Sequence, residues 1–238
     1  SRNQKGKLLY LAEIFHRETD EAHGLTLAEL TERLAAYGVQ AERKTLYADM
    51  EELRRCGLDI TSWKEGREYR YRLASREFEL PELKLLVDAV QSSKFLSERK
   101  SMQLIAKLET LASQYAAGSL RRQVTVAGRV KTMNESVYYS VDLLHEAIQK
   151  NSRITFRYFD YDLNGARRYR PGLYAASPYA LCWQDENYYL IAHSERHGLT
   201  HYRVDKMASI SLTGEPRYMD AQMRDLDLSE YGKNVFGM

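Results

Sequence analysis

Apolar residues in the first 55 positions recur at helical spacing in three separate stretches. The first stretch covers residues 5–17 and predicts a helix. The second begins at Thr26, where Glu29 completes a capping box, and it stops at Gly38, a good C-cap residue. A three-residue turn, 39–41, leads into the third stretch. Two short helices joined by such a turn form the pattern of a helix-turn-helix.

The third stretch, residues 41–53, combines an apolar stripe with exposed polar groups. Its apolar members stand at i, i+4 and i+7 on one face: Leu46, Met50 and Leu53. Its polar members fall off that stripe near the start of the helix: Arg43, Lys44 and Tyr47. Cationic and hydroxyl side chains at this end are what a recognition helix in a DNA major groove requires. The pattern also fits an ordinary amphipathic helix with a solvated charged face.

A strand pair is predicted next, around residues 64–66. The returning strand alternates, with Tyr69, Tyr71 and Leu73 on one face and with Arg70 and Arg72 on the other. We expect a β-hairpin that forms the wing of a winged helix. Lys64 and Arg67 lie at or near its tip, where a wing contacts phosphates. A solvated hairpin tip is the alternative for both residues.

The middle of the chain is predicted to be helical between residues 81 and 117. Its apolar stripes fit a core or a dimer surface better than a ligand site. The stretch from 118 to 131 carries basic residues without an acidic one: Arg121, Arg122, Arg129 and Lys131. We expect it either to lie over DNA or to be a solvated linker.

The remainder begins with a helix, 141–150, and then becomes rich in strands. The candidate strands are 153–159, 167–174, 179–184, 188–193, 199–205 and 209–213. Several short strands separated by turn signals favour a small barrel over a βαβ sheet.

Two parts of the sequence resemble a known family. The run RKTLYADMEELRRCGLDI, followed by EYRYRL, resembles the DeoR-like winged helix at the N-terminus of WYL-domain transcriptional regulators. Ala48 stands where that family often has Arg. The runs SPYALCWQDENYYLIAHSE and HYRVDKM resemble the WYL domain, an Sm-like barrel with a leading helix. Tyr188 replaces the usual Trp of the WYL tripeptide, while Tyr189 and Leu190 match it.

Together these observations predict an α+β protein with four parts. Residues 1–74 form a winged helix-turn-helix, 75–134 a helical linker or dimerisation segment, and 135–214 the WYL domain with its small Sm/SH3-like β-barrel. Residues 215–238 form a tail. Its end, DLDLSEYGKNVFGM, resembles the point where many family members continue into a C-terminal extension, so we expect further chain there.

The resemblance implies that the WYL domain senses an effector, with single-stranded nucleic acid or a nucleotide as the suggested class. Arginine forks suit phosphate, and aromatic rings stack on bases. The expected effector-binding residues are Arg157, Tyr158, Arg168, Arg170, Tyr189, His193, His201 and Arg203. A tight hairpin would set His193 about opposite His201. Tyr189 also fits a place in the core.

Charge supports DNA binding only weakly. The net charge is +2, and residues 1–74 hold 13 basic and 13 acidic residues. DNA binding is therefore predicted from where the charges lie and not from their net number. Catalytic motifs are missing from the sequence, and we expect no enzyme, cofactor or metal site. The triplet His193, His197 and His201 has metal-ligand spacing only on a helix, whereas a hairpin is predicted there. The polar N-terminus and two distant cysteines favour a cytoplasmic, nucleoid-associated protein.

We therefore expect a ligand-responsive DNA-binding transcriptional regulator, active as a homodimer on a partly palindromic operator of double-stranded DNA. Arg43, Lys44 and Tyr47 would contact DNA from the helix. Thr45 would hold a backbone phosphate, and Lys64 or Arg67 would contact DNA from the wing. Two alternatives remain at this stage. One is a nucleic-acid sensor that does not act at promoters, such as a defence-associated module; the other is a helix-turn-helix that serves protein association.

Overall fold

A computed structural model describes residues 4–120, 136–219 and 231 of the chain. The chain divides into two compact units, each with its own core. One unit contains the N-terminal helices and hairpin together with α4, α6 and most of α5. The other contains Ser93–Lys100, α7 and a six-stranded sheet. The helical segment predicted as a separate linker thus groups mainly with the N-terminal part.

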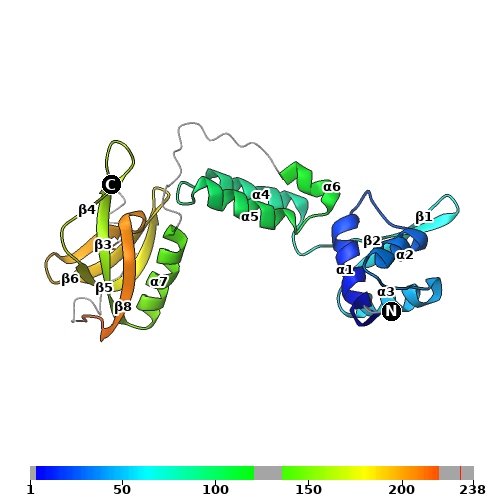
Figure 1. Ribbon diagram of the computed structural model, residues 1–238, viewed down its shortest axis with the longest axis horizontal. Coiled ribbons are helices and arrows are strands. Elements are labelled where there is room, and N and C mark those ends of the chain that lie inside the picture. The colour runs from blue at the N-terminus through cyan, green and yellow to red at the C-terminus, as the bar shows by residue number, and fades with distance from the viewer. Residues whose placement is uncertain (1–3, 121–135, 220–230, 232–238) are drawn as a thin grey trace. The chain divides into compact units, whose positions relative to one another are not determined.

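The N-terminal elements follow the predicted order (Figure 1). They are η1 (Gln4–Gly6), α1 (Lys7–Glu18), α2 (Leu27–Ala36), α3 (Arg43–Arg55), β1 (Ile60–Glu65) and β2 (Glu68–Leu73). The capping box is confirmed, because Thr26 Oγ1 accepts from the Glu29 N–H (3.2 Å) and Glu29 Oε2 accepts from the Thr26 N–H (2.7 Å). Gly38 follows α2 with a φ of 71°, a conformation that favours glycine.

One apolar core holds these elements together. The predicted stripe of α3 is buried, with Leu46 and Met50 at 0% and 1% exposure and Leu53 at 5%. They pack with Leu11 and Phe15 of α1 and with residues of α2 and the hairpin. Because this stripe faces the core, the remaining side of α3 faces outward.

The middle segment forms α4 (Leu80–Ser92), α5 (Glu98–Glu109), α6 (Gln114–Ala117) and η2 (Gly118–Leu120). Its core is small and is built on Leu83, Val87, Ala112 and Leu120. Apolar side chains such as Leu85 (70%) and Met102 (59%) are exposed. The basic residues expected to lie over DNA or in a linker, Arg121, Arg122, Arg129 and Lys131, fall outside the described residues.

The second unit packs α7 (Val137–Gln149) on an antiparallel sheet (Figure 1). The strands are β3 (Ser152–Tyr161), β4 (Arg167–Tyr169), β5 (Tyr174–Gln184), β6 (Asn187–Ser194), β7 (Gly198–Arg203) and β8 (Met207–Pro216). A short helix, η3 (Val204–Lys206), joins β7 to β8. The six predicted strands are present, except that the predicted 167–174 strand breaks at Pro171-Gly172 and its last residue begins β5.

The sheet is strongly curled. Irregular pairing interrupts β3 against β8 and β5 against β6, and such bulges bend strands. The strand order is β8-β3-β5-β6-β7, with β4 on the far end of β3. Among the described strands, no pairing joins β7 to β8, so the sheet forms a half-barrel where a small Sm/SH3-like β-barrel was predicted. None of the described helices is long and apolar enough to span a membrane.

Candidate nucleic-acid interface

The start of α3 presents the side chains predicted to read DNA. Arg43, Lys44 and Tyr47 are exposed in the first two turns, and Ala48 is exposed beside them. Tyr47 retains 45% of its surface in contact with solvent. The buried stripe on the opposite side of the helix fixes this orientation.

A buried lysine holds this end of α3 against α1. Lys7 is 6% exposed, and its ammonium donates to Thr45 Oγ1 (2.8 Å) and forms an ion pair with Asp49. The Thr45 hydroxyl donates its single hydrogen to the Glu42 carbonyl (2.9 Å). Because this hydroxyl already donates and accepts within the protein, a phosphate at Thr45 would compete with the Glu42 carbonyl, and the expected phosphate contact stays a prediction. Sequence reasoning missed Lys7, whose polar side chain gave no sign of burial.

A groove of about 440 Å³ separates α3 from the hairpin. Arg43 and Tyr47 line it from α3, and Arg67 lines it from the hairpin turn. The first residues of α2, from Thr26 on, form another part of the wall, and the N-terminus of a helix favours an anion. The structure thus brings three of the predicted DNA contacts to one groove. Lys44 and Lys64 are exposed but are not part of its lining.

Two tyrosines connect the groove to the core. The Tyr47 ring meets the Tyr71 ring edge to face, with centroids 6.4 Å apart. Burial and the hydrogen bond with Tyr47 raise the pKa of Tyr71 to about 12. The hydrogen bonds from Tyr71 and Arg43 lower the pKa of Tyr47. Tyr47 is therefore oriented by its neighbours while its ring stays accessible.

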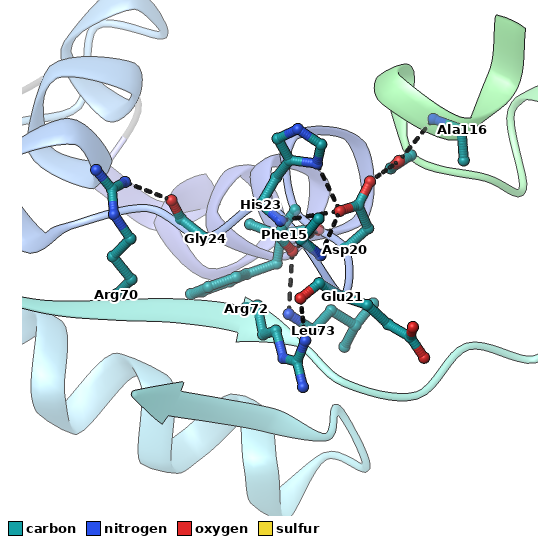
Figure 2. Close-up of polar contacts among 12 residues, drawn as sticks. Phe15, Asp20, Glu21, His23, Gly24, Arg70, Arg72, Leu73 and Ala116 are labelled. Atoms are coloured by element: carbon teal, nitrogen blue, oxygen red, sulfur yellow. Dashed lines mark hydrogen bonds and ion pairs between the residues drawn. The ribbon is translucent and has the colours of Figure 1, made fainter. Parts of the chain in front are cut away.

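The hairpin is fastened to the loop between α1 and α2 by two arginines that sequence reasoning placed on its other face (Figure 2). The Arg70 guanidinium donates to the Gly24 carbonyl (2.8 Å) and pairs with Glu29 (3.3 Å), and the Arg72 guanidinium donates to the Glu21 carbonyl. These bonds fix the hairpin relative to α2, and so they help to fix Arg67, which lines the same groove as Arg43.

The same loop joins the N-terminal helices to α6 (Figure 2). Asp20 accepts from the Ser113 hydroxyl (2.6 Å), and His23 Nδ1 lies 2.7 Å from its other oxygen. The His23 ring stacks on Tyr115, with centroids 3.8 Å apart. Burial raises the pKa of Asp20, but the hydrogen bonds from Ser113 and His23 outweigh burial and hold the pKa below its usual value. The sequence indicated only a polar break here.

In the second unit, three of the predicted effector-binding arginines lie at β3 and β4, with Arg168 and Arg170 on the face of Asp160 and Arg157 on the face of Tyr169. Arg157, Arg168 and Arg170 are exposed. The Arg157 guanidinium lies 4.2 Å from the centre of the Tyr169 ring. Aromatic rings beside permanently charged forks are suited to nucleotide phosphates and bases.

An acidic residue on β3 holds one of these arginines together with a lysine. Asp160 pairs with Arg170 (2.9 Å) and with Lys206 (2.7 Å). Hydrogen bonds from Lys206 and Arg170 lower the pKa of Asp160 to about 2. Lys206 was not predicted as a site residue, because its approach to β3 depends on the path of η3.

The expectation for Tyr158 needs correction, because only 8% of it is exposed. Its ring packs among Phe156, Tyr174 and Tyr202, and its hydroxyl accepts from the Arg203 N–H (3.1 Å). A base cannot stack on a ring enclosed in this way. Tyr158 is a core residue that links β3 to β7.

Arg203 is only partly available for a ligand. Its guanidinium binds Asp205 through two hydrogen bonds (3.0 and 2.8 Å) and donates to Asn187 (3.1 Å). Tyr189 lies opposite Arg203 in the ladder and is half-buried. A phosphate at Arg203 would therefore compete with Asp205.

The register of β6 and β7 differs from the predicted one. His193 lies opposite Leu199 and His201 lies opposite Ile191, because a three-residue turn, 195–197, joins the strands. The two histidines share one face as diagonal neighbours. His193 stacks on Tyr218 and His201 on Tyr231, and burial lowers the pKa of His201.

Three comparisons place these observations among known proteins. The WYL domain model matches residues 140–212. No curated protein matches the chain significantly. Among solved structures, the chain is similar to the proteasome accessory factor B/C (PafBC) of Arthrobacter aurescens, with 17% sequence identity and a TM-score of 0.31. That match covers 95% of this chain and 35% of the solved chain. Residues 140–212, which include α7 from Ser140 onward and the sheet as far as Leu212, are a WYL domain.

Proposed function

We propose that this chain is a DNA-binding transcriptional regulator whose WYL domain senses single-stranded nucleic acid or a nucleotide. In this proposal α1 to α3 and the β1–β2 hairpin form a winged helix-turn-helix. The observation that carries the proposal is the groove in which Arg43 and Tyr47 of α3 face Arg67 of the hairpin turn. A protein of this kind would work in the cytoplasm, at the nucleoid.

The charges of the groove favour a phosphate chain over a protein partner. Two arginines offer fixed positive charge, and Tyr47 offers a hydroxyl beside them. Arg70 and Arg72 are bound within the protein, whereas Arg43 and Arg67 are exposed at the groove. Glu68 also lines the groove and would oppose a phosphate that came too close to the hairpin.

Fluorescence anisotropy with duplex DNA from upstream of the protein's own gene tests the DNA-binding half. We expect Arg43→Ala to lose about 1–3 kcal/mol of binding free energy and to relax sequence preference. Arg55→Ala is the matched control, because Arg55 is an exposed arginine at the other end of α3, paired with Glu52. Its loss should leave binding close to that of the wild type.

The same titration at two salt concentrations separates the alternatives. Phosphate neutralisation predicts that binding weakens steeply as salt rises. A helix-turn-helix used for protein association predicts little change. Equal binding by Arg43→Ala and the wild type would contradict the assignment of α3 as the reading helix.

The effector half of the proposal is supported by the exposed arginines of β3 and β4. Arg168 is exposed on β4, and Arg157 lies over an aromatic ring. We expect Arg168→Ala to weaken the binding of a short single-stranded oligonucleotide and to reduce its salt dependence. Lys150→Ala is the control, because Lys150 is an exposed cation at the end of α7. Equal losses in both variants would contradict a specific site.

We also propose that two copies bind a partly palindromic operator. Two recognition helices related by a two-fold axis would enter successive major grooves about 34–36 Å apart. Exposed apolar residues on α4 and α5 are available for such an association. Sedimentation of the DNA complex would show two chains per operator if this is correct, and one chain would contradict it.

A further inference from the structure

The tail of the WYL domain lies across the face that carries the predicted effector histidines. Residues Arg217–Met219, here called the strap, follow β8 directly. The Arg217 N–H donates to the Asn151 carbonyl (2.7 Å), and the Arg217 guanidinium donates to the Pro178 carbonyl (3.2 Å). The strap is therefore held against β5 and against the residue before β3.

An aromatic ring of the strap stacks on a histidine of β6. The Tyr218 and His193 ring centroids lie 4.3 Å apart, and the ring planes differ by 20°. A second tyrosine of the tail, Tyr231, stacks on His201 in a similar way, at 5.3 Å and 25°. Both histidines predicted to face a ligand thus already carry a planar ring from the same chain.

The backbone of Tyr218 makes two hydrogen bonds that the edge of a bound nucleobase could also make. Its N–H donates to Ser177 Oγ (2.8 Å), and its carbonyl accepts from the Tyr179 hydroxyl (2.6 Å). Ser177 and Tyr179 are 2% and 7% exposed, so their polar atoms need a partner at this place. The edge of a nucleobase offers the same combination of one donor and one acceptor next to a planar ring.

We propose that His193, Ser177 and Tyr179 form a nucleobase site and that Tyr218 is its occupant in the free protein. A base then binds only when Tyr218 has moved off His193. The apparent dissociation constant therefore equals that of the open form divided by the fraction of molecules that are open. This inference rests on the proposed function, in which the WYL domain binds single-stranded nucleic acid. It adds the position of one base and an internal competitor for that position.

A titration of the full chain with a fluorescein-labelled oligodeoxyadenylate of about 12 nucleotides tests the proposal. Removal of the competing ring in Tyr218→Ala should tighten binding about 2- to 10-fold, the range expected for the loss of one aromatic stack. Tyr218→Phe keeps the ring and should bind like the wild type. Adding His193→Ala to Tyr218→Ala should abolish the gain, because the stacking surface is then missing.

Tyr115→Ala is the matched control. Tyr115 is also a partly exposed tyrosine stacked on a histidine, His23, but it lies in the other unit. Its loss should leave oligonucleotide binding unchanged. A gain in Tyr115→Ala equal to that in Tyr218→Ala would overturn the proposal.

These experiments distinguish a failure of the strap proposal from a failure of the proposed function. If the wild type binds and Tyr218→Ala binds equally well or more weakly, the strap is no competitor, while nucleic-acid sensing stands. If neither binds, both the strap proposal and the effector half of the proposed function fail.

A measurement on the wild type covers the case in which Tyr218→Ala does not fold. Amide hydrogen exchange at Tyr218 should become faster when the oligonucleotide is saturating, because its hydrogen bond to Ser177 is then broken. Slower exchange at Tyr218 in the complex would overturn the proposal.

Discussion

At the scale of single residues, hydrogen-bond partners decide which side chains are available for function. Thr45 is exposed, yet its hydroxyl is engaged by Lys7 and Glu42. Arg203 keeps its charge but binds Asp205 with two hydrogen bonds. Arg168, in contrast, projects from β4 into solvent. A residue type that suits phosphate is therefore not enough to predict a phosphate contact. The hydrogen-bond partners that the side chain already has within the protein decide whether it is available.

Asp160 provides a pH-dependent test at this scale. Its folded-state pKa of about 2 lies below the ordinary value of 3.8, so the ionised carboxylate stabilises the fold above about pH 4. This contribution is lost as the pH falls toward 2. Since the side chain is 38% exposed, we expect the loss to stay below about 1 kcal/mol.

Urea unfolding at about pH 6 and about pH 3 measures this contribution. Asp160→Asn should be less stable than the wild type at the higher pH, and the difference should shrink at the lower pH. Asp142→Asn, at an exposed position of α7, should show no such change. A difference between Asp160→Asn and the wild type that is constant with pH would contradict the role of the carboxylate.

At the scale of elements, the position of the β1–β2 hairpin depends on its close contact with the loop before α2. Gly24 lies at this contact, and its carbonyl accepts from Arg70. A Cβ atom on Gly24 would lie 2.7 Å from Trp63 Cζ3 and 3.1 Å from Arg70 Cβ. The hairpin can approach the loop this closely only because the residue is glycine.

We expect Gly24→Ala to destabilise the N-terminal unit by about 1–3 kcal/mol, because the hairpin must shift to make room. Gly118→Ala is the control, since no atom lies within 4 Å of the position of its Cβ apart from those of its chain neighbours and its own helix. Urea unfolding followed by tryptophan fluorescence would measure both variants, with Trp63 reporting on the N-terminal unit and Trp183 on the other unit. Equal stability of Gly24→Ala and the wild type would show that the hairpin does not pack against this loop.

At the scale of the whole molecule, two compact units predict two unfolding events. The main core of one unit is built from α1 to α3 and the hairpin, and the core of the other from α7 and the curled sheet. A ligand that binds one folded unit stabilises that unit by mass action, by about 2.7 kcal/mol at 100 times its dissociation constant. Two ligands that bind different units should therefore act on different transitions.

We expect differential scanning calorimetry to resolve two transitions. Duplex DNA should raise the midpoint of one transition, and a single-stranded oligonucleotide should raise that of the other. The Gly24→Ala variant identifies the first, because it should lower only the transition that duplex DNA raises. A single transition that moves with either ligand would contradict independent units.

The sequence by itself determined the elements of this protein. Helical spacing, the capping box at Thr26 and Glu29, and strand alternation act over a few residues, so the helices and strands could be predicted from the chain alone. The tripeptide region around Tyr189 and Leu190 marked the WYL domain, which the family model matches. Exposure of Arg43, Lys44 and Tyr47 followed from the same helical spacing.

Only the tertiary structure decided how these elements meet. Lys7 contacts Thr45 across 38 positions and Ser113 contacts Asp20 across 93, and no local pattern encodes such pairs. The burial of Tyr158, the register that separates His193 from His201, and the groove at Arg67 likewise depend on packing between distant segments. Local spacing sets which face of an element is apolar, whereas the partner of each side chain depends on where the other elements pack.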